Sequence, residues 1–125
     1  METEVTMEDA WGIEPEGQLS VDVIETDHEI FVRSAIAGAH AENFDIQVTQ
    51  DTVTIRGKRK AEHVLSEPNV VHLEECYWGS FSRSIVLPCH VRPEDADAVF
   101  KNGILTIRLK KAAMPSSIPI ITLDE

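Results

Sequence analysis

Short runs in which apolar and polar residues alternate, separated by polar turns, constrain this chain more than any other feature. Two of these runs place apolar side chains at Leu19, Val21 and Val23, and at Phe44, Ile46 and Val48. Alternation with period two is typical of a half-buried strand, because successive side chains point to opposite faces. Strands this short, joined by tight turns, indicate an all-β, antiparallel sandwich rather than a fold built on crossover helices.

Two turn signals divide the chain. Gln50-Asp51 follows the run at residues 44–48 and predicts a tight turn. Asn102-Gly103 lies between the runs at residues 97–100 and 104–109. Asn-Gly is the strongest short hairpin signal, because these residues readily adopt the positive φ that such a turn requires. We therefore expect the last two strands to form a hairpin.

The run at residues 80–87 sets an arginine among apolar neighbours. Its alternate positions share one face of the predicted strand and are Phe81, Arg83, Ile85 and Leu87. An arginine that is buried or held in an interface needs a carboxylate partner. Arg83 is therefore a candidate interface residue, and an exposed arginine on an irregular strand is the alternative.

Residues 58–78 form a long stretch between two strands. A structureless loop of about 20 residues in a compact domain requires an explanation. Its first part is polar, but residues 70–74 are apolar and β-branched enough to form a strand, and they read Val70, Val71, His72, Leu73 and Glu74. A strand carried on a long loop can pair with a neighbouring molecule, and we hypothesise that residues 70–74 do so.

Residues 110–125 are irregular and hold an apolar pair in a polar setting. Ile118 and Ile120 flank Pro119, which favours an extended backbone, so the two isoleucines are expected to point the same way. An exposed apolar pair usually marks a binding surface when it is not simply part of an ordinary tail. We expect this pair to dock on another surface.

Length and charge limit the function classes. The 125 residues indicate one domain, with a flexible acidic arm at residues 1–17, a sandwich at 18–111 and a flexible tail at 112–125. Eleven Lys and Arg against 22 Asp and Glu give a net charge of −11, which argues against nucleic acid as a partner. No apolar run is long enough for a membrane span. Residues 1–10 are acidic, unlike a signal peptide, so we expect a cytoplasmic protein.

The sequence offers no catalytic, cofactor or metal motif. The five histidines lack metal-ligand spacing, and neither His-Glu-x-x-His nor Cys-x-x-Cys occurs. We expect Cys76 and Cys89 to remain reduced, because a chain without an export signal meets a reducing compartment. No nucleophile elbow, Walker loop or dinucleotide fingerprint is present, so we expect no enzyme activity and no cofactor.

Several segments, in this order and spacing, resemble the small heat-shock proteins of bacterial type over about residues 17–121. They are Val21-Asp22-Val23 with Glu25, Ile36-Ala37-Gly38, Asp51-Thr52-Val53-Thr54-Ile55-Arg56-Gly57-Lys58-Arg59, Gly79-Ser80-Phe81-Ser82-Arg83, Ile85-Val86-Leu87-Pro88, Ala98-x-x-x-Asn102-Gly103-Ile104-Leu105 and Ile118-Pro119-Ile120. The run Glu75-Cys76-Tyr77-Trp78 before Gly79 carries the bacterial character. Family members usually have a longer and more hydrophobic N-terminal arm than this one.

The resemblance implies an immunoglobulin-like sandwich, the α-crystallin domain, with an exchanged strand on a long loop. It implies a dimer interface formed by Leu19, Val21, Val23, Val70, Val71, His72, Leu73 and Arg83. It also implies that the tail anchor Ile118, Pro119 and Ile120 docks in a groove of another dimer. That groove would be lined by Phe44, Ile46, Val48, Ala98, Val99 and Phe100.

The resemblance further implies an ATP-independent holdase that keeps unfolding client proteins from aggregating under heat or other stress and assembles with copies of itself. An adaptor or co-chaperone sandwich that binds one defined folded partner is the alternative. The long loop and the Ile-x-Ile tail favour the holdase, because such adaptors lack both. An enzyme on a sandwich scaffold would need convergent polar groups in a pocket, and the sequence supplies none.

Overall fold

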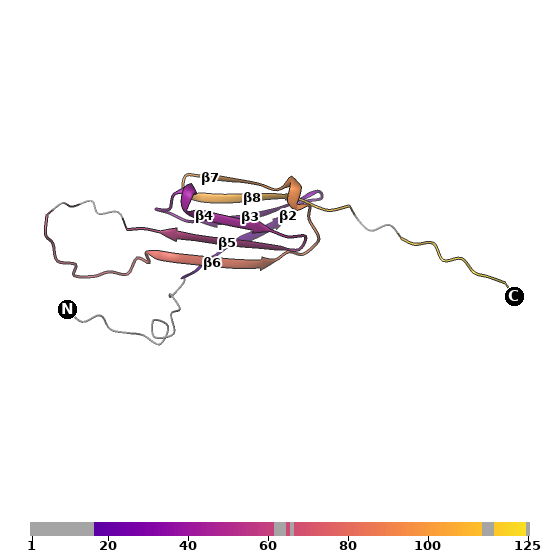
Figure 1. The fold of residues 1–125 in the computed structure, drawn as a ribbon, viewed down its shortest axis with the longest axis horizontal. Coiled ribbons are helices and arrows are strands. Elements are labelled where there is room, and N and C mark those ends of the chain that lie inside the picture. The colour runs from indigo at the N-terminus through magenta and orange to yellow at the C-terminus, as the bar shows by residue number, and fades with distance from the viewer. Residues whose placement is uncertain (1–16, 62–64, 66, 114–116, 125) are drawn as a thin grey trace.

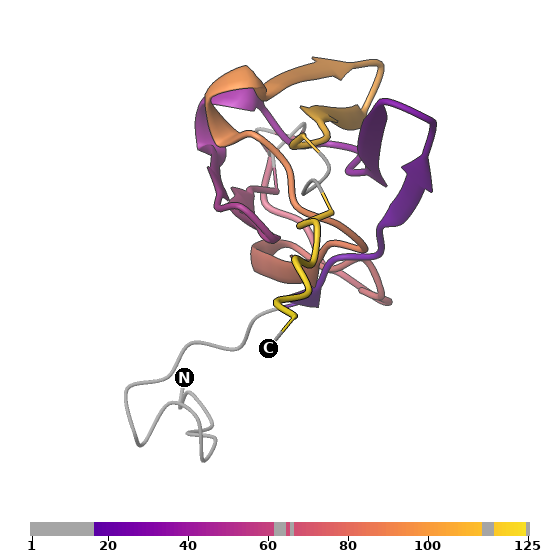
Figure 2. The ribbon, with the colours of Figure 1, turned by 90° about the vertical axis from the view of Figure 1, so that its right-hand side faces the viewer.

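A computed structural model describes residues 17–61, 65, 67–113 and 117–124, and it contains two four-stranded sheets packed face to face. The strands are β1 (Gly17–Gln18), β2 (Asp22–Glu25), β3 (Glu29–Ala35), β4 (Phe44–Val48), β5 (Thr52–Arg59), β6 (Gly79–Val86), β7 (Asp97–Lys101) and β8 (Ile104–Lys110). Two single turns of 3₁₀ helix, η1 (Ala41–Asn43) and η2 (Pro93–Asp95), precede β4 and β7. Figure 2, which looks along the strands, shows the sheets as the two walls of a sandwich.

One sheet has the order β1-β6-β5-β4 and the other β2-β3-β8-β7. All pairings are antiparallel except that of β1 with β6, which is parallel and two residues long. The prediction of an all-β antiparallel sandwich is confirmed, with this short parallel pair as the one difference. The β5–β6 loop and the residues after β8 leave the sandwich at opposite ends (Figure 1).

The core is aliphatic and comes from the inward faces of both sheets. In the β3–β8 pair, Ile30 faces Leu109 and Val32 faces Ile107, and all four are essentially inaccessible to water. The buried apolar residues are Leu19, Ile30, Val32, Ile36, Val53, Ile55, Phe81, Ile85, Leu87, Val91, Leu105, Ile107 and Leu109. Burial of each large side chain stabilises the fold by about 1.5–3 kcal/mol before ordering costs. The two-residue alternation in the sequence is therefore the pattern of this core.

The two turns fall where the sequence predicts them. Residues 49–51 join β4 to β5, and Asn102-Gly103 joins β7 to β8 with φ angles of 53° and 76°. Gly57 in β5 meets a different need, because a Cβ there would lie 2.6 Å from Cζ of Phe81 and 2.8 Å from Cδ1 of Phe44. The missing side chain lets both rings pack across the sheet.

The first predicted strand is divided in the structure. The sequence predicts one strand over residues 19–23, but β1 ends at Gln18 in one sheet and β2 begins at Asp22 in the other. Leu19 lies in the core between them, and the carbonyl of Ser20 accepts a hydrogen bond of 2.7 Å from the hydroxyl of Ser34. The chain crosses from sheet to sheet here, so β1 is the outer strand of one sheet and β2 is the outer strand of the other.

Candidate functional site

Two apolar segments of this chain lie outside its own core. Val70 and Leu73 in the β5–β6 loop are 77% and 76% exposed, and residues 70–74 form no strand of either sheet in the described part of the chain. In the tail, Ile118 and Ile120 are 86% and 93% exposed. Exposed apolar groups gathered in one place mark interaction sites more often than scattered ones do.

The edge of β2 is one surface that fits such a segment. Within the described strands, β2 is the outer strand of its sheet and pairs on one side with β3, so its other side offers backbone N–H and C=O groups to an incoming strand. Val23 is exposed on β2, and Val21 packs partly against the core just before it. Leu19 is buried in its own subunit, so it supports this edge from within.

Arg83 stabilises the crossing that leads to β2. Its side chain lies on the inward face between Phe81 and Ile85, as the alternation predicts, and is half-buried. Its Nη1 donates a hydrogen bond of 2.9 Å to the carbonyl oxygen of Leu19. The sequence argument called for a carboxylate partner, whereas among the described residues this backbone oxygen is the acceptor. Arg83 is only half-buried, so water can reach the rest of its guanidinium.

Arg59 closes the base of the long loop, and the sequence analysis did not single it out. Its Nε and Nη2 donate to the carbonyl oxygen of Tyr77 at 3.0 and 2.6 Å, and its Nη1 donates to that of Ala37 at 3.1 Å. The guanidinium carbon also lies 5.4 Å from the ring centroid of Trp78, a cation–π distance. These contacts join Arg59 at the start of the loop to Tyr77 at its end, so the two ends of the loop that carries residues 70–74 are held together.

A groove between the edges of the two sheets is the second surface. It has a volume of about 300 Å³ and is lined by Ile46, Val48, Pro93, Ala96, Asp97, Ala98 and Ile107. The sequence analysis named Ile46, Val48 and Ala98 among its residues. Phe44 and Phe100 do not line it but pack edge to face beside it, with ring centroids 5.0 Å apart. A groove of this size, in which most lining residues are aliphatic and Asp97 is charged, suits one or two aliphatic side chains.

Val99 was expected to line the groove, and the structure shows that it does not. In β7 the side chains of Ala98 and Phe100 point inward, so Val99 points outward and is 59% exposed. It lies with Arg33, Ile104 and Thr106 on the outer face of its sheet. The sequence Ala98-Val99-Phe100 is apolar throughout, so it contains no alternation from which the inward positions could be read.

The described residues offer no metal site and no membrane helix. Among them, no group of three or more His, Cys, Asp or Glu side chains is placed to hold a metal ion. No helix in this part of the chain is long and apolar enough to cross a membrane. Cys76 is exposed and Cys89 half-buried, and both are free thiols.

The sandwich, its open β2 edge and the groove define an α-crystallin type of domain, and comparisons with known proteins agree. Residues 22–121 match the Hsp20/alpha crystallin family. Small heat shock protein C4 of Rickettsia felis is 37% identical over 90 residues, covering 72% of this chain and 55% of that protein. Small heat shock protein C2 of the same bacterium is 33% identical over 90 residues, covering 72% and 58%. The chain therefore belongs to the Hsp20/alpha crystallin family.

The structural neighbours are small heat-shock proteins as well. Heat shock protein 16.0 from Schizosaccharomyces pombe superposes with a TM-score of 0.71 at 27% identity, covering 87% of this chain and all of that one. The hspA protein of Xanthomonas axonopodis gives a TM-score of 0.66 at 27% identity, covering 78% and 96%. The chain spans little more than half the length of the Rickettsia relatives that it matches.

Proposed function

We propose that this chain is an ATP-independent holdase chaperone, which binds non-native proteins and suppresses their aggregation under heat or other stress, and that it catalyses no reaction. The observation that carries the proposal is the pair of exposed apolar segments, each matched by an unfilled surface of the same fold. Family membership supports the same conclusion. Its partners are copies of itself and unfolding client proteins in the cytoplasm, and nucleic acid is not among them.

The dimer in this proposal forms by strand exchange. Residues 70–74 of one chain add a strand to the open edge of β2 in a partner, so that unpaired backbone groups on both sides gain hydrogen bonds. The interface comprises Val21, Val23, Val70, Val71, His72 and Leu73, and Leu19 and Arg83 hold the crossing beneath it. The fixed base at Arg59 supports the proposal, because it lets the loop project away from its own sheets.

Higher assembly in this proposal depends on the tail. Residues 112–125 form a linker and anchor, and Ile118 and Ile120 insert into the groove between β4 and β7 of another dimer. Burial of two isoleucine side chains contributes on the order of 3–6 kcal/mol. Ordering the tail opposes this by about 1–2 kcal/mol per fixed residue. The net energy per tail is small, so assembly is reversible, and many tails acting together still hold it.

Client capture then follows from mass action. Unfolding proteins expose apolar surface and strand edges, and the same groove and edge can cover them when heat loosens the assembly. Binding the non-native state removes it from the aggregation pathway. The net charge of −11 keeps the loaded complex in solution. The alternative, an adaptor for one folded partner, would not need two exposed segments that fit the chain's own surfaces.

A light-scattering experiment separates these functions. The chain should suppress the aggregation of several unrelated heated or reduced proteins without ATP, at less than one chain per client. An adaptor would leave their aggregation unchanged and would bind a single partner in its folded state. Unchanged scattering for every client, over a range of ratios and temperatures, would contradict the holdase proposal.

A further inference from the structure

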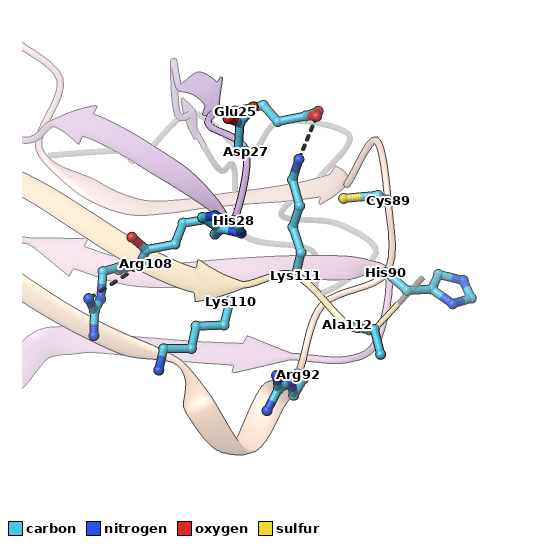
Figure 3. Close-up of a pocket in the computed structure, with 12 residues that line it drawn as sticks. Glu25, Asp27, His28, Cys89, His90, Arg92, Arg108, Lys110, Lys111 and Ala112 are labelled. Carbon is cyan, nitrogen blue, oxygen red and sulfur yellow. Dashed lines mark hydrogen bonds and ion pairs between the residues drawn. The ribbon is translucent and has the colours of Figure 1, made fainter. Parts of the chain in front are cut away.

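The tail leaves the sandwich beside a cavity of about 1180 Å³, and neither proposed assembly contact uses this cavity. Figure 3 shows that three segments meet around it, namely the β2–β3 turn, the β6–β7 connection and the residues at the end of β8. Lys110 and Lys111 line it where the tail begins. Because open space rather than packed side chains lies beside Lys111, the direction of the tail there depends on hydrogen bonds and ion pairs.

The tail root, which consists of Lys111 and Ala112, is held by backbone hydrogen bonds. The N–H of Lys111 donates to the carbonyl oxygen of His28 at 3.0 Å, and the N–H of Ala112 donates to that of His90 at 2.9 Å. Beyond the root, residues 113 and 117–124 make no backbone hydrogen bond with another described residue. Within the part of the chain that the structure describes, the root is therefore the last point that the backbone ties to the sandwich.

One side-chain contact joins the tail root to β2. Nζ of Lys111 donates to Oε2 of Glu25 at 2.8 Å, a contact drawn dashed in Figure 3. Lys111 is half-buried, and Glu25 is the last residue of β2, the strand whose open edge is proposed to receive residues 70–74 of a partner. The other cations of the cavity make no ion pair with β2 among the described residues, and they are Arg92, Arg108 and Lys110. Glu25 therefore connects the tail root to the edge proposed for strand exchange.

The distance from the root to the tail anchor is short. Six residues separate Ala112 from Ile118, and six extended residues span up to about 20–22 Å. An eight-residue strand such as β6 is longer, at about 26 Å. A linker of this length restricts the anchor to grooves near the root. The direction in which the root points therefore decides which groove Ile118 and Ile120 reach.

We propose that Glu25 is a positioning residue for assembly, which holds Lys111 and thereby fixes the direction in which the tail leaves the sandwich. The anchor of each chain then reaches a groove in one defined direction, and the assembly contains a defined number of dimers. Without Glu25 the backbone bonds of the root remain, but the tail samples more directions and dimers join in more than one arrangement. This proposal rests on the tail docking proposed above.

Two matched variants of the 125-residue chain test the role of Glu25 at the root. Glu25→Ala removes the pair with Lys111, and Asp22→Ala removes the pair with Arg33, which has an N···O distance of 3.3 Å, from the other end of β2 with the same loss of charge. In Glu25→Ala, hydrogen exchange at the amides of Lys111 and Ala112 should be about two- to fivefold faster, the range expected for one partly exposed ion pair. Asp22→Ala should leave these amides at the wild-type rate.

Native mass spectrometry of the same variants tests the consequence for assembly, which a purely structural role of Glu25 would not alter. Glu25→Ala should spread the assembly over more numbers of dimers than the wild type, Lys111→Ala should do the same, and Asp22→Ala should keep the wild-type distribution.

Two outcomes would overturn the proposal. One is a Glu25→Ala variant with the exchange rates or the mass distribution of the wild type, and the other is an equal change in Asp22→Ala. The variant Ile118→Ala with Ile120→Ala separates this proposal from tail docking. If that variant keeps the native mass, both are wrong. If it shrinks the assembly while Glu25→Ala leaves the distribution unchanged, only the role of Glu25 is wrong.

Discussion

Ile30 and Ile55 are completely buried between the two sheets, whereas Ile118 and Ile120 in the tail keep 86% and 93% of their surface exposed. The same side chain thus occupies opposite environments in one protein. The buried pair stabilises the folded state of a single chain, without any contact to another molecule. The exposed pair contributes nothing to that stability and gains free energy only when a second surface covers it. The difference separates the apolar residues that stabilise the fold of this chain from those that, in the proposed assembly, would contact other copies.

The core side of the comparison gives the largest expected effect. Ile55→Ala removes a buried side chain from the centre of β5 and leaves a cavity, so the free energy of unfolding should fall by about 2–5 kcal/mol. Chemical denaturation would measure the loss. Ile118→Ala is the matched control at an exposed position and should change the unfolding of the sandwich by less than about 0.5 kcal/mol. Similar losses of unfolding free energy at Ile55 and Ile118 would contradict the difference between the buried and the exposed isoleucines.

The next largest effect is expected on dimer dissociation, from a substitution in the β5–β6 loop. Val71→Pro removes a backbone N–H from the middle of the proposed exchanged strand, so a ladder hydrogen bond is lost and the dimer should weaken at least tenfold. Val71→Thr is the control, because it keeps the N–H and the β-branched shape. Sedimentation equilibrium would measure dimer dissociation in both variants. Two variants with the wild-type dissociation constant would rule out strand pairing through residues 70–74.

The tail variant should change the assembly without changing the fold. Ile118→Ala with Ile120→Ala should shrink the assembly towards dimers while leaving the melting temperature of the sandwich nearly constant. Ile121→Ala with Leu123→Ala is the control, since these residues are also exposed but lie outside the Ile-Pro-Ile motif. Light scattering coupled to size exclusion would measure the masses. Equal shrinkage in both double variants would show that the tail acts only through its general hydrophobicity.

The smallest effect concerns the ion pair at the base of the tail. The hydrogen bond from Lys111 to Glu25 raises the pKa of Lys111 above its ordinary value of 10.5. A raised pKa of a cation adds stability below about pH 10.5, and this stability is lost as the pH rises through the pKa of the folded state. Glu25→Gln should therefore reduce stability slightly at pH 8 and make no difference once Lys111 is neutral. A difference that persists unchanged at high pH would point to another cause.

The sequence analysis predicted the sandwich because alternation is a local signal. Alternation with polar neighbours indicates that the side chains of Ile30, Val32, Ile55 and Leu109 point into the core, where all four are buried. Asn102-Gly103 specifies its turn because both residues adopt a positive φ. The open β2 edge was only partly predictable. Residues 19–23 keep a two-residue alternation although the chain changes sheets there, so the pattern did not reveal that β2 starts at Asp22.

Features that depend on the meeting of distant segments were not predictable. Arg59 binds the carbonyl groups of Ala37 and Tyr77, which only the fold brings near it. The outward direction of Val99 depends on the register of β7 against β8, and the cavity beside Lys110 combines three separate segments. Composition contains none of this information. The sequence therefore predicted which segments are apolar better than it predicted the surfaces that receive them.

The mass of the native protein at micromolar concentration tests the central claim most directly, namely that the exposed apolar segments are covered by other copies of the chain. The monomer has a mass of 13.9 kDa. Native mass spectrometry should give an even number of chains, dimers and multiples of dimers. A protein that stays monomeric with residues 70–74 and both tail isoleucines exposed would contradict the claim.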